Sequence, residues 1–481
     1  MTKRQMPGIF SRVSRVEISM RMKIYPAALV STLFLVGVSL VAAQSDGPSV
    51  QPPPVNAPSA EFLRAADEVL ADMSAILSLP VKSPLKKTMR TREEIRAYVL
   101  REFKEDKRPE KRYADQRAME KFGLIPKGFA LETFMVDLFT EQIAGLYDPK
   151  SREFFIADWI APADQRTIMA HELTHALHDQ YFDLDKWSEG AKENDDADLA
   201  RHAVMEGSAF VAMMDWTFRE QKLSVRAMPD LGPILEKQMA ADSEKSTLFS
   251  KAPPFLRKVM LFPYLSGAVF SQRVLQANTG WADFPKVFAN PPVSTQQILH
   301  PEIYLRGEAP KPVVLPNLAG VILPDWKKLD ENVNGEFFLH AVLEQFAGAA
   351  RADSLAPAWS GDRYALYEQE KTKRLLLVYR LHLDSAAGAA RMFGGLSEAL
   401  EGIHETRRDL FRRPNYFQFD TEDGGVFLRC VNEECVLVDG TTREVFDGVI
   451  RAMGWSPAPP VPDKSKKEVI AQFGSSTAPI F

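Results

Sequence analysis

Up to about residue 350, apolar residues recur mainly at intervals of three and four, the period of an amphipathic helix. Such a stripe between Phe62 and Met73 predicts a helix that begins after Ser59. The segment Thr91-Arg-Glu-Glu94 has the form of a capping box and predicts a second helix that continues to Phe103. The same period predicts helices over 131–146, 165–181 and 195–219, and a mostly helical stretch over 229–350 with proline-rich breaks at 252–254, 285–292 and 309–324.

Strand patterns are rare before this limit and dominate after it. Glu153–Ile156 follows the Asp148-Pro149 turn and predicts one short strand. Beyond Trp359 the pattern changes to short apolar runs separated by turns. It predicts, in order, a strand over Leu375–Leu383, a helix over 386–402, strands over Tyr416–Thr421, Val426–Asn432 and Cys435–Val438, and a last helix capped by Thr441-Thr-Arg-Glu444 that ends at Met453.

These elements predict an α+β protein with two structural domains. The larger is mainly helical, carries a small edge sheet and covers residues 59–350; the smaller is an α+β unit over 360–455. About one hundred residues is a usual size for such a unit. Two proline-rich stretches flank them, and we predict a flexible linker over 44–58 and a disordered tail over 456–481.

The N-terminus has the pattern of an export signal. An apolar run over 27–43 ends in Val-Ala-Ala and follows six basic residues, Lys3, Arg4, Arg12, Arg15, Arg21 and Lys23. This order predicts a signal peptide over 1–43, with Met20 and Met22 as alternative start sites, and a secreted or periplasmic protein. The run is at the short limit for a bilayer span, so an uncleaved membrane anchor stays open as the alternative.

The net charge of the chain limits the classes of partner that it is expected to bind. Removing residues 1–43 takes away six basic residues and one acidic residue, which changes the formal net charge from −5 to −10. An acidic balance suits a soluble extracytoplasmic protein, and no basic face accumulates that would bind nucleic acid. The sequence gives no sign of the oligomeric state.

The two cysteines, Cys430 and Cys435, lie close together between two apolar runs, as if across a hairpin. In an oxidising compartment this arrangement predicts a local disulfide. A pair of reduced, half-buried thiols is the alternative.

Three of the eight histidines fall in His171-Glu-Leu-Thr-His-Ala-Leu-His178. Residues four apart lie on one face of a helix, one turn apart, so His171 and His175 can reach one ion. Glu172 lies beside the first of them and can reach a water at that ion. This is the H-E-x-x-H arrangement of zinc peptidases, and it predicts a Zn2+ site.

Two imidazoles leave a zinc ion underfilled, so a third ligand is needed. Glu206 follows His175 by 31 residues, enough for a loop and a returning helix. His178 is displaced around the helix from the stripe of His171 and His175, which favours a polar surface residue. Weaker rivals are Asp183, Asp185 and His202, the last of which could instead face the second shell or the substrate; Glu193, Asp195, Asp196 and Asp198 are interpreted as solvated loop charges.

The site resembles that of the gluzincin zinc metallopeptidases, in which a glutamate on a following helix completes H-E-x-x-H. Glu206-Gly-Ser-Ala209 is similar to the third-ligand stretch of the aminopeptidase branch. His171–Gln180, together with Glu141–Pro149, which reads Glu-Gln-Ile-Ala-Gly-Leu-Tyr-Asp-Pro, resembles a group of exported bacterial H-E-x-x-H proteins. The resemblance is strong over 131–215 and weaker over 262–306 and 331–367. It implies a zincin-like fold for the helical domain.

One position departs from the gluzincin pattern. These enzymes often carry an acidic residue four positions after the third ligand, bonded to a zinc-bound histidine, and this chain has Phe210 there. Glu206 as a metal ligand is therefore an expectation that needs the structure.

The resemblance implies a peptidase that hydrolyses peptide bonds with a zinc-bound water activated by Glu172 as general base. The oxyanion needs a further donor. His300 is our catalytic candidate, although a helix-terminal histidine bonded to backbone is an equal reading of it; Tyr304, Tyr147 and Tyr264 follow. The strand near Phe154–Ile156 is expected to be an edge that pairs with extended substrate. For Gly361-Asp-Arg-Tyr364 we expect a structural turn.

Two other functions stay open. A zinc-binding but non-hydrolytic envelope scaffold or partner-binding protein is favoured by Phe210 and by the unassigned C-terminal domain. The retained Glu172 argues against it, because a structural site does not need that base. Hydrolysis of a non-peptide amide is the third reading. Peptide or protein substrate is thus the expected partner, and a membrane only if the N-terminal segment stays uncleaved.

Overall fold

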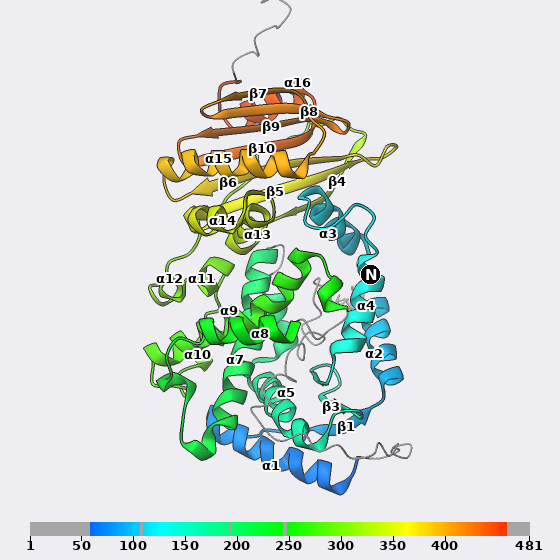
Figure 1. Ribbon diagram of the computed structural model, residues 1–481, viewed down its shortest axis with the longest axis vertical. Helices are drawn as coiled ribbons and strands as arrows, with labels where there is room; N and C mark the ends of the chain where they lie inside the picture. Colours follow the sequence, from blue (N-terminus) through cyan, green and yellow to red (C-terminus); the bar gives the residue numbers. More distant parts are fainter. Residues whose placement is uncertain (1–57, 106–108, 192–193, 244–247, 459–481) are drawn as a thin grey trace, which may run out of the picture.

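The computed structural model describes residues 58–105, 109–191, 194–243 and 248–458. The predicted signal peptide, nearly all of the predicted linker and most of the predicted tail lie outside the described residues. The predicted α+β class is confirmed: a mainly helical region occupies one end of the long axis and a large antiparallel sheet occupies the other (Figure 1). Within the described part, every helix is too short or too polar to span a membrane.

The first helices begin where the capping residues predict. Helix α1 (Ala60–Leu77) starts after Ser59, whose hydroxyl accepts a hydrogen bond from the backbone of Phe62. Helix α2 (Arg92–Glu105) starts at the predicted capping box, since Thr91 and Glu94 each bond the backbone N–H of the other. Helix α3 (Pro109–Lys121) then leads toward the C-terminal sheet.

A three-stranded sheet lies beside these helices, in the order β1-β3-β2. Its strands are β1 (Lys86–Arg90), β2 (Gly145–Asp148) and β3 (Glu153–Ala157). Strand β3 is the strand predicted at 153–156, but it is central, with β1 parallel on one side and β2 antiparallel on the other. The expectation that this strand is an open edge for substrate is therefore wrong, because both of its hydrogen-bonding edges are paired.

Helix α4 (Leu131–Gln142) ends four residues before the predicted limit, and Leu146 belongs to β2. The apolar run that suggested a longer helix is buried in a strand instead: all four residues of β2 are buried. A short buried run cannot be assigned to helix or strand by periodicity alone.

Three long helices form the centre of the helical region: α5 (Pro162–Phe182), α7 (Asp195–Thr217) and α9 (Pro254–Ala277). Helices α7 and α9 approach closely at Gly207 and Gly267, where a Cβ on either glycine would overlap the backbone of the other helix. Only glycine permits such an approach. Shorter elements complete the region: α6 (Leu184–Glu189), α8 (Gly232–Ser243), α10 (Pro285–Ala289), α11 (Thr295–Leu299), α12 (Pro301–Leu305), and 3-10 turns at Arg219–Gln221, Val225–Ala227 and Phe249–Lys251.

The C-terminal sheet has seven antiparallel strands in the order β4-β5-β6-β10-β9-β8-β7. Alternate residues of a strand face opposite sides. Leu377 and Tyr379 accordingly join the main core, while Leu376 and Val378 pack with the last helix in a second core. The elements are β4 (Trp326–Asn332), α13 (Gly335–Ala347), α14 (Ala349–Leu355), a 3-10 turn (Ala356–Ala358), β5 (Trp359–Gln369), β6 (Leu375–Leu383), α15 (Ala386–Ile403), β7 (Arg408–Arg413), β8 (Tyr416–Thr421), β9 (Gly424–Val431), β10 (Glu434–Thr441) and α16 (Arg443–Ala452).

Several strands were not predicted, and one prediction is corrected. The sheet reaches back to β4, inside the range predicted as the helical domain. Residues 361–364, predicted as a turn, lie within β5. The predicted disulfide is confirmed: Cys430 and Cys435 are directly opposite each other on β9 and β10 and are joined.

Candidate metal centre

Helix α5 carries the H-E-x-x-H segment through the middle of the helical region. Proline at its first position suits the start of a helix, since that position needs no intrahelical N–H bond. From Ile168 to His178 every side chain is buried. The helix is apolar around the histidines, so it is held on all sides and presents His171 and His175 one turn apart to helix α7.

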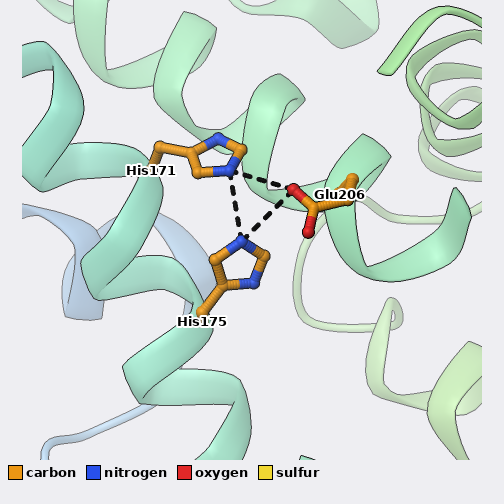
Figure 2. Close-up of side chains that lie close together, drawn as sticks. All are labelled: His171, His175 and Glu206. Carbon is orange, nitrogen blue, oxygen red and sulfur yellow. Dashed lines mark hydrogen bonds and ion pairs between the residues drawn. The ribbon is translucent and has the colours of Figure 1, made fainter. Parts of the chain in front are cut away.

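Glu206 faces these histidines from α7, and the three side chains converge (Figure 2). The two imidazole Nε2 atoms are 3.1 Å apart. Glu206 Oε2 lies 3.2 Å from His171 Nε2 and 3.5 Å from His175 Nε2. His171 and Glu206 are fully buried, and His175 is 4 % exposed. The structure thus brings together the three residues predicted as metal ligands.

The spacing of the three donor atoms fits a tetrahedral ion. Ligands about 2.0–2.1 Å from a tetrahedral centre lie about 3.3 Å from one another, which matches the separations of 3.1–3.5 Å. Two imidazole nitrogens and one carboxylate oxygen are a ligand set that zinc accepts. Two nitrogen lone pairs directed at one point repel each other unless a proton or a cation lies between them. The group is a candidate site for a metal ion.

Electrostatics favour the ligand forms of these side chains. Burial lowers the pKa of His171, which keeps its imidazole neutral. Burial by itself raises the pKa of the Glu206 carboxyl, but the charge of His175 and hydrogen bonds from both imidazoles outweigh it and lower that pKa strongly. A neutral imidazole and an ionised carboxylate are the forms that bind a metal.

Glu172, the predicted base, lies beside the group and is fully buried. Its Oε2 accepts a hydrogen bond of 2.9 Å from the backbone N–H of Tyr147 on β2. Its Oε1 is buried and has no hydrogen-bond partner among the described residues. Burial and the charge of Glu206 raise its pKa well above the usual range. One oxygen is therefore fixed while the other is left to accept a proton.

The outer nitrogens of the two histidines lack the support usual in zinc sites. Metal-bound histidines generally donate the second ring N–H to a carboxylate or carbonyl. Here Nδ1 of His171 and Nδ1 of His175 are buried with no partner in the described part of the chain. Phe210, where gluzincins often carry an acid, is itself buried. The departure from the gluzincin pattern at Phe210 is thus accompanied by the lack of a described hydrogen bond to Nδ1 of either histidine.

Tyr264 on α9 is the nearest of the four predicted oxyanion donors. Its hydroxyl hydrogen-bonds Glu206, and its ring stacks on that of His171 with centroids 6.3 Å apart. Burial and the charges of Glu206 and Glu172 raise its pKa, so it stays a neutral donor. Sequence reasoning ranked it last, because nothing in the local pattern of α9 ties position 264 to α5 or α7.

The other three donors make different contacts. His300 Nε2 lies 2.7 Å from Glu336 Oε1, and no described contact joins His300 to the metal ligands. The hydroxyl of Tyr304 donates to a backbone carbonyl, and that of Tyr147 donates to Asp179. Tyr147 nevertheless touches the site through its backbone N–H, a contact that no side-chain pattern can reveal.

The structure also shows where the weaker ligand candidates lie. His178, predicted as a surface residue, is instead buried against Phe182 and Phe288, and burial together with His175 lowers its pKa to about 3. His202 is buried one turn before Glu206 and interacts with its carboxylate. Asp183 and Asp185 are exposed. Glu193 lies outside the described residues. Asp195, Asp196 and Asp198 form the first turn of α7, and the solvated-loop interpretation is wrong for Asp196, which is 2 % exposed.

A second group of three ligand-type side chains lies at the start of α7. The carboxylates of Asp115, Asp195 and Asp330 are close enough together to hold an ion. The ammonium of Lys111, however, pairs with all three, at 3.2 Å from Asp195 and from Asp330 and closer to Asp115. A cation from the chain itself already lies in this group.

Comparison with known proteins concerns the other end of the molecule. A family model described as a domain of unknown function (DUF8575) matches residues 324–450. The match begins just before β4 and ends in α16, so it covers the seven-stranded sheet and none of the candidate metal ligands. No curated protein and no solved structure matches the chain.

Proposed function

We propose that the protein is a metal-dependent hydrolase, exported from the cell, that cleaves peptide bonds with Glu172 as general base. His171, His175 and Glu206 would hold the ion, and zinc is the metal that this donor set suits best. A bound zinc ion supplies Lewis acidity toward water and toward the substrate carbonyl. The other steps belong to side chains of the chain itself.

The observation that carries this proposal is the state of Glu172. A structural metal site has no use for a buried carboxylate that is not a ligand. Glu172 is fully buried next to the ligands, with one oxygen fixed by the Tyr147 N–H and the other without a partner among the described residues. Burying a carboxylate with few hydrogen bonds lowers stability. The raised pKa of Glu172 suits a residue that takes up a proton and later gives it to the leaving amine.

Tyr264 is the second group with a role in this proposal. Its hydroxyl is bonded to Glu206 and lies within the field of Glu172, so it is fixed between ligand and base. To donate to a developing oxyanion, this neutral phenol must turn its single O–H away from Glu206. Tyr264 replaces His300 as our candidate for this donor, because Tyr264 contacts the metal ligands His171 and Glu206, whereas no described contact joins His300 to them.

The test is Glu172→Gln. The amide keeps the shape and can still accept the Tyr147 N–H bond, so metal content should stay near one ion per chain. Cleavage of a casein or peptide library should fall by about 10²–10⁴-fold, the usual contribution of a general base. Glu368→Gln, at a buried glutamate on β5, is the matched control and should keep full activity. Full activity in Glu172→Gln would refute the assignment of the base.

A second function, a metal-binding protein without hydrolysis, is favoured by one observation. His171, Glu172 and Glu206 are fully buried and His175 is 4 % exposed, so the described structure does not present these side chains to a polypeptide substrate. If the wild-type protein binds zinc at one equivalent but cleaves nothing in a peptide library or a panel of small amides, this scaffold function replaces the first. Cleavage of small amides alone would indicate a non-peptide amidase.

Export and compartment are part of the same proposal. They rest on the N-terminal pattern of residues 1–43 and are consistent with the bonded pair Cys430–Cys435. N-terminal sequencing of the protein from culture medium or periplasm would locate the cleavage site and decide between a released protein and an anchored one.

A further inference from the structure

A second buried polar cluster lies where the metal-bearing helix α7 meets the C-terminal sheet. Its three acids are Asp196 in the first turn of α7, Glu336 in the first turn of α13 and Asp362 on β5. They are 2 %, 3 % and 2 % exposed. We call these three residues, with Thr295 and Gly335 between them, the junction.

Asp196 fastens α7 to two other helices. Its Oδ1 accepts hydrogen bonds from the backbone N–H of Thr295, at 2.9 Å, and from the Thr295 hydroxyl. The same hydroxyl accepts a 3.1 Å bond from the N–H of Phe337 on α13. Gly335, at φ +81°, passes so close that a Cβ there would overlap the Asp196 carboxylate. Helices α7, α11 and α13 therefore meet at one carboxyl group.

Asp362 fastens the sheet to the same point. Its oxygens accept bonds from the backbone N–H groups of Asn334 and Gly335, at 2.8 and 2.9 Å, and from the Trp359 indole at 2.7 Å. It thus caps the start of α13 from β5, an arrangement that stabilises an anion at a helix N-terminus. Movement of the sheet relative to α7 must break bonds to Asp362 or to Asp196.

Negative groups outnumber positive ones in the junction. Glu336 is paired with the partly exposed His300, which Glu302 also faces at 4.0 Å. Arg363 lies near Asp362 but bonds Glu331, and the neighbouring Asp195 is paired with Lys111. The phenol of Tyr379 lies close to both Asp196 and Asp362. Asp196 Oδ2 and Glu336 Oε2 are buried without a hydrogen-bond partner among the described residues.

We propose that the junction is a proton-operated latch between the metal-bearing helix and the C-terminal sheet, closed while Asp196 carries a proton on its unbonded Oδ2 and loosened when Asp196 ionises. Three buried carboxyls of like charge on three different elements repel one another once ionised, and two of their oxygens lack a donor that would stabilise the charge. Protonation removes the repulsion and turns an acceptor into a donor. The closed form is the one in which the metal ligands are enclosed.

The direction of the pH effect follows from the titrating groups. Burial raises the pKa of Asp196 well above the usual range and that of Asp362 to about 6. A carboxyl with a raised pKa binds more protons in the folded state, so its contribution falls as pH rises from its unfolded value near 3.8 through about 6. The hydrogen bond to Glu336 raises the pKa of His300, so loss of that imidazolium on alkalinisation acts in the same direction. Rising pH loosens the latch.

Hydrogen exchange of the purified mature chain at pH 5 and pH 8, corrected for intrinsic rates, tests this. We expect the opening constant of peptides from 194–200, 294–300 and 332–340 to rise by more than about tenfold over this interval, because Asp362, whose pKa is shifted from 3.8 to about 6, contributes about tenfold and Asp196 adds to it. Asp196→Asn retains an acceptor for Thr295 but cannot ionise, so the response should fall to the about tenfold rise that Asp362 contributes. Equal exchange at both pH values, or a full response in Asp196→Asn, would overturn the proposal.

Asp439→Asn is the matched control. Asp439 is equally buried, but its pKa is lowered to about 2, so it is ionised throughout the interval and its replacement should leave the full wild-type response intact. If Asp196→Asn does not fold, the urea-unfolding constant of wild type from pH 5 to pH 8 decides, because a flat profile contradicts the latch.

The effect of the latch on the metal centre rests on the proposed function, whereas the latch itself does not. Ligand protonation makes zinc release to a chelator slower as pH rises. The latch acts in the opposite sense, so between pH 6 and pH 8 wild type should release zinc faster than Asp196→Asn. Equal rates would separate the latch from the metal centre, and exchange data would still decide the latch in a protein without hydrolytic activity.

Discussion

The two groups of potential metal ligands among the described residues differ in one respect that is visible only in three dimensions. At the metal centre, two imidazoles and Glu206 direct their donor atoms at one point. At the start of α7, Asp115, Asp195 and Asp330 do the same, but the ammonium of Lys111 lies among them. Burial of like charges needs a compensating cation, and the second group contains its own.

This comparison teaches how to separate a metal site from a salt-bridge cluster. Proximity of ligand atoms is common to both groups, so proximity alone does not distinguish them. The metal centre is distinguished by its neutral imidazole nitrogens, which zinc accepts as ligands. A lysine ammonium in their place would repel an imidazolium. A neighbouring base distinguishes the metal centre further, since Glu172 lies beside the first group.

The largest effect is expected for a variant that removes one ligand from the metal centre. Glu206→Gln keeps the hydrogen bond to Tyr264 but removes the anionic ligand, and metal content after dialysis should fall from one ion per chain to near zero by atomic absorption. Glu368→Gln serves again as the control with normal content. Normal zinc in Glu206→Gln would show that another residue completes the ligand set.

The next largest effect is expected for a variant that removes the Lys111 ammonium from the group of three aspartates. Lys111→Met leaves three carboxylates close together without their cation, and because Asp195 is exposed and Lys111 is partly exposed, we expect a cost of about 1–3 kcal/mol, below that of breaking a fully buried pair. Urea unfolding measures this, and Lys258→Met, which removes a partly exposed pair with Glu344, should cost less than about 1 kcal/mol. Calcium, which binds carboxylate oxygens, should restore part of the loss in Lys111→Met only. An unchanged stability would mean that Lys111 does not balance these charges.

Another buried carboxylate, that of Asp439, extends the comparison to the dependence of stability on pH. Asp439 bonds Lys121 at 2.7 Å and His404 at 2.9 Å. Burial raises its pKa, but these neighbours outweigh burial and lower it to about 2. A depressed pKa adds stability above the unfolded value near 3.8, lost as pH falls through about 2, and the contribution is about 2 kcal/mol. Unfolding between pH 5 and pH 2 should show it, and Asp439→Asn should lack this component of acid lability.

The smallest effect concerns support of the metal ligands. Tyr264→Phe removes the hydrogen bond to Glu206 and should weaken zinc binding about tenfold, the lower end for loss of a second-shell partner. Competition with a coloured chelator measures the affinity. Tyr304→Phe, which loses only a bond to a backbone carbonyl, should bind zinc as wild type does, and equal affinities of all three proteins would exclude the supporting role of Tyr264.

The metal centre could be predicted because its signal is local. His171, Glu172 and His175 lie within one turn of a helix whose period is plain in the sequence, so spacing alone places them on one face. To predict Glu206 as a ligand, one more inference was needed, namely that a second helix of suitable length returns beside the first. Tyr264 and the backbone of Tyr147 reach the site from other elements, and their positions follow from packing that a single sequence does not display.

The fold was predicted well where apolar periodicity is strong and poorly at sheet edges. Strands β6 and β8 begin and end at the predicted residues, since they alternate or run apolar through the core. Strands β4 and β7 are edge strands rich in charged residues, and a charged edge is a common way to prevent further strand pairing. Asp196 was misjudged for a related reason: its partners come from α11, α13 and β5, distant in sequence.

The contact between Gly207 and Gly267 sets the mechanics of the site. Because the backbones of α7 and α9 touch there, we expect the two helices to move together and to carry Glu206 and Tyr264 with them. His171, Glu172 and His175 belong to another helix, α5. A motion that admits a substrate would then separate two preformed halves and leave each half undistorted, so that closing them again rebuilds the same geometry.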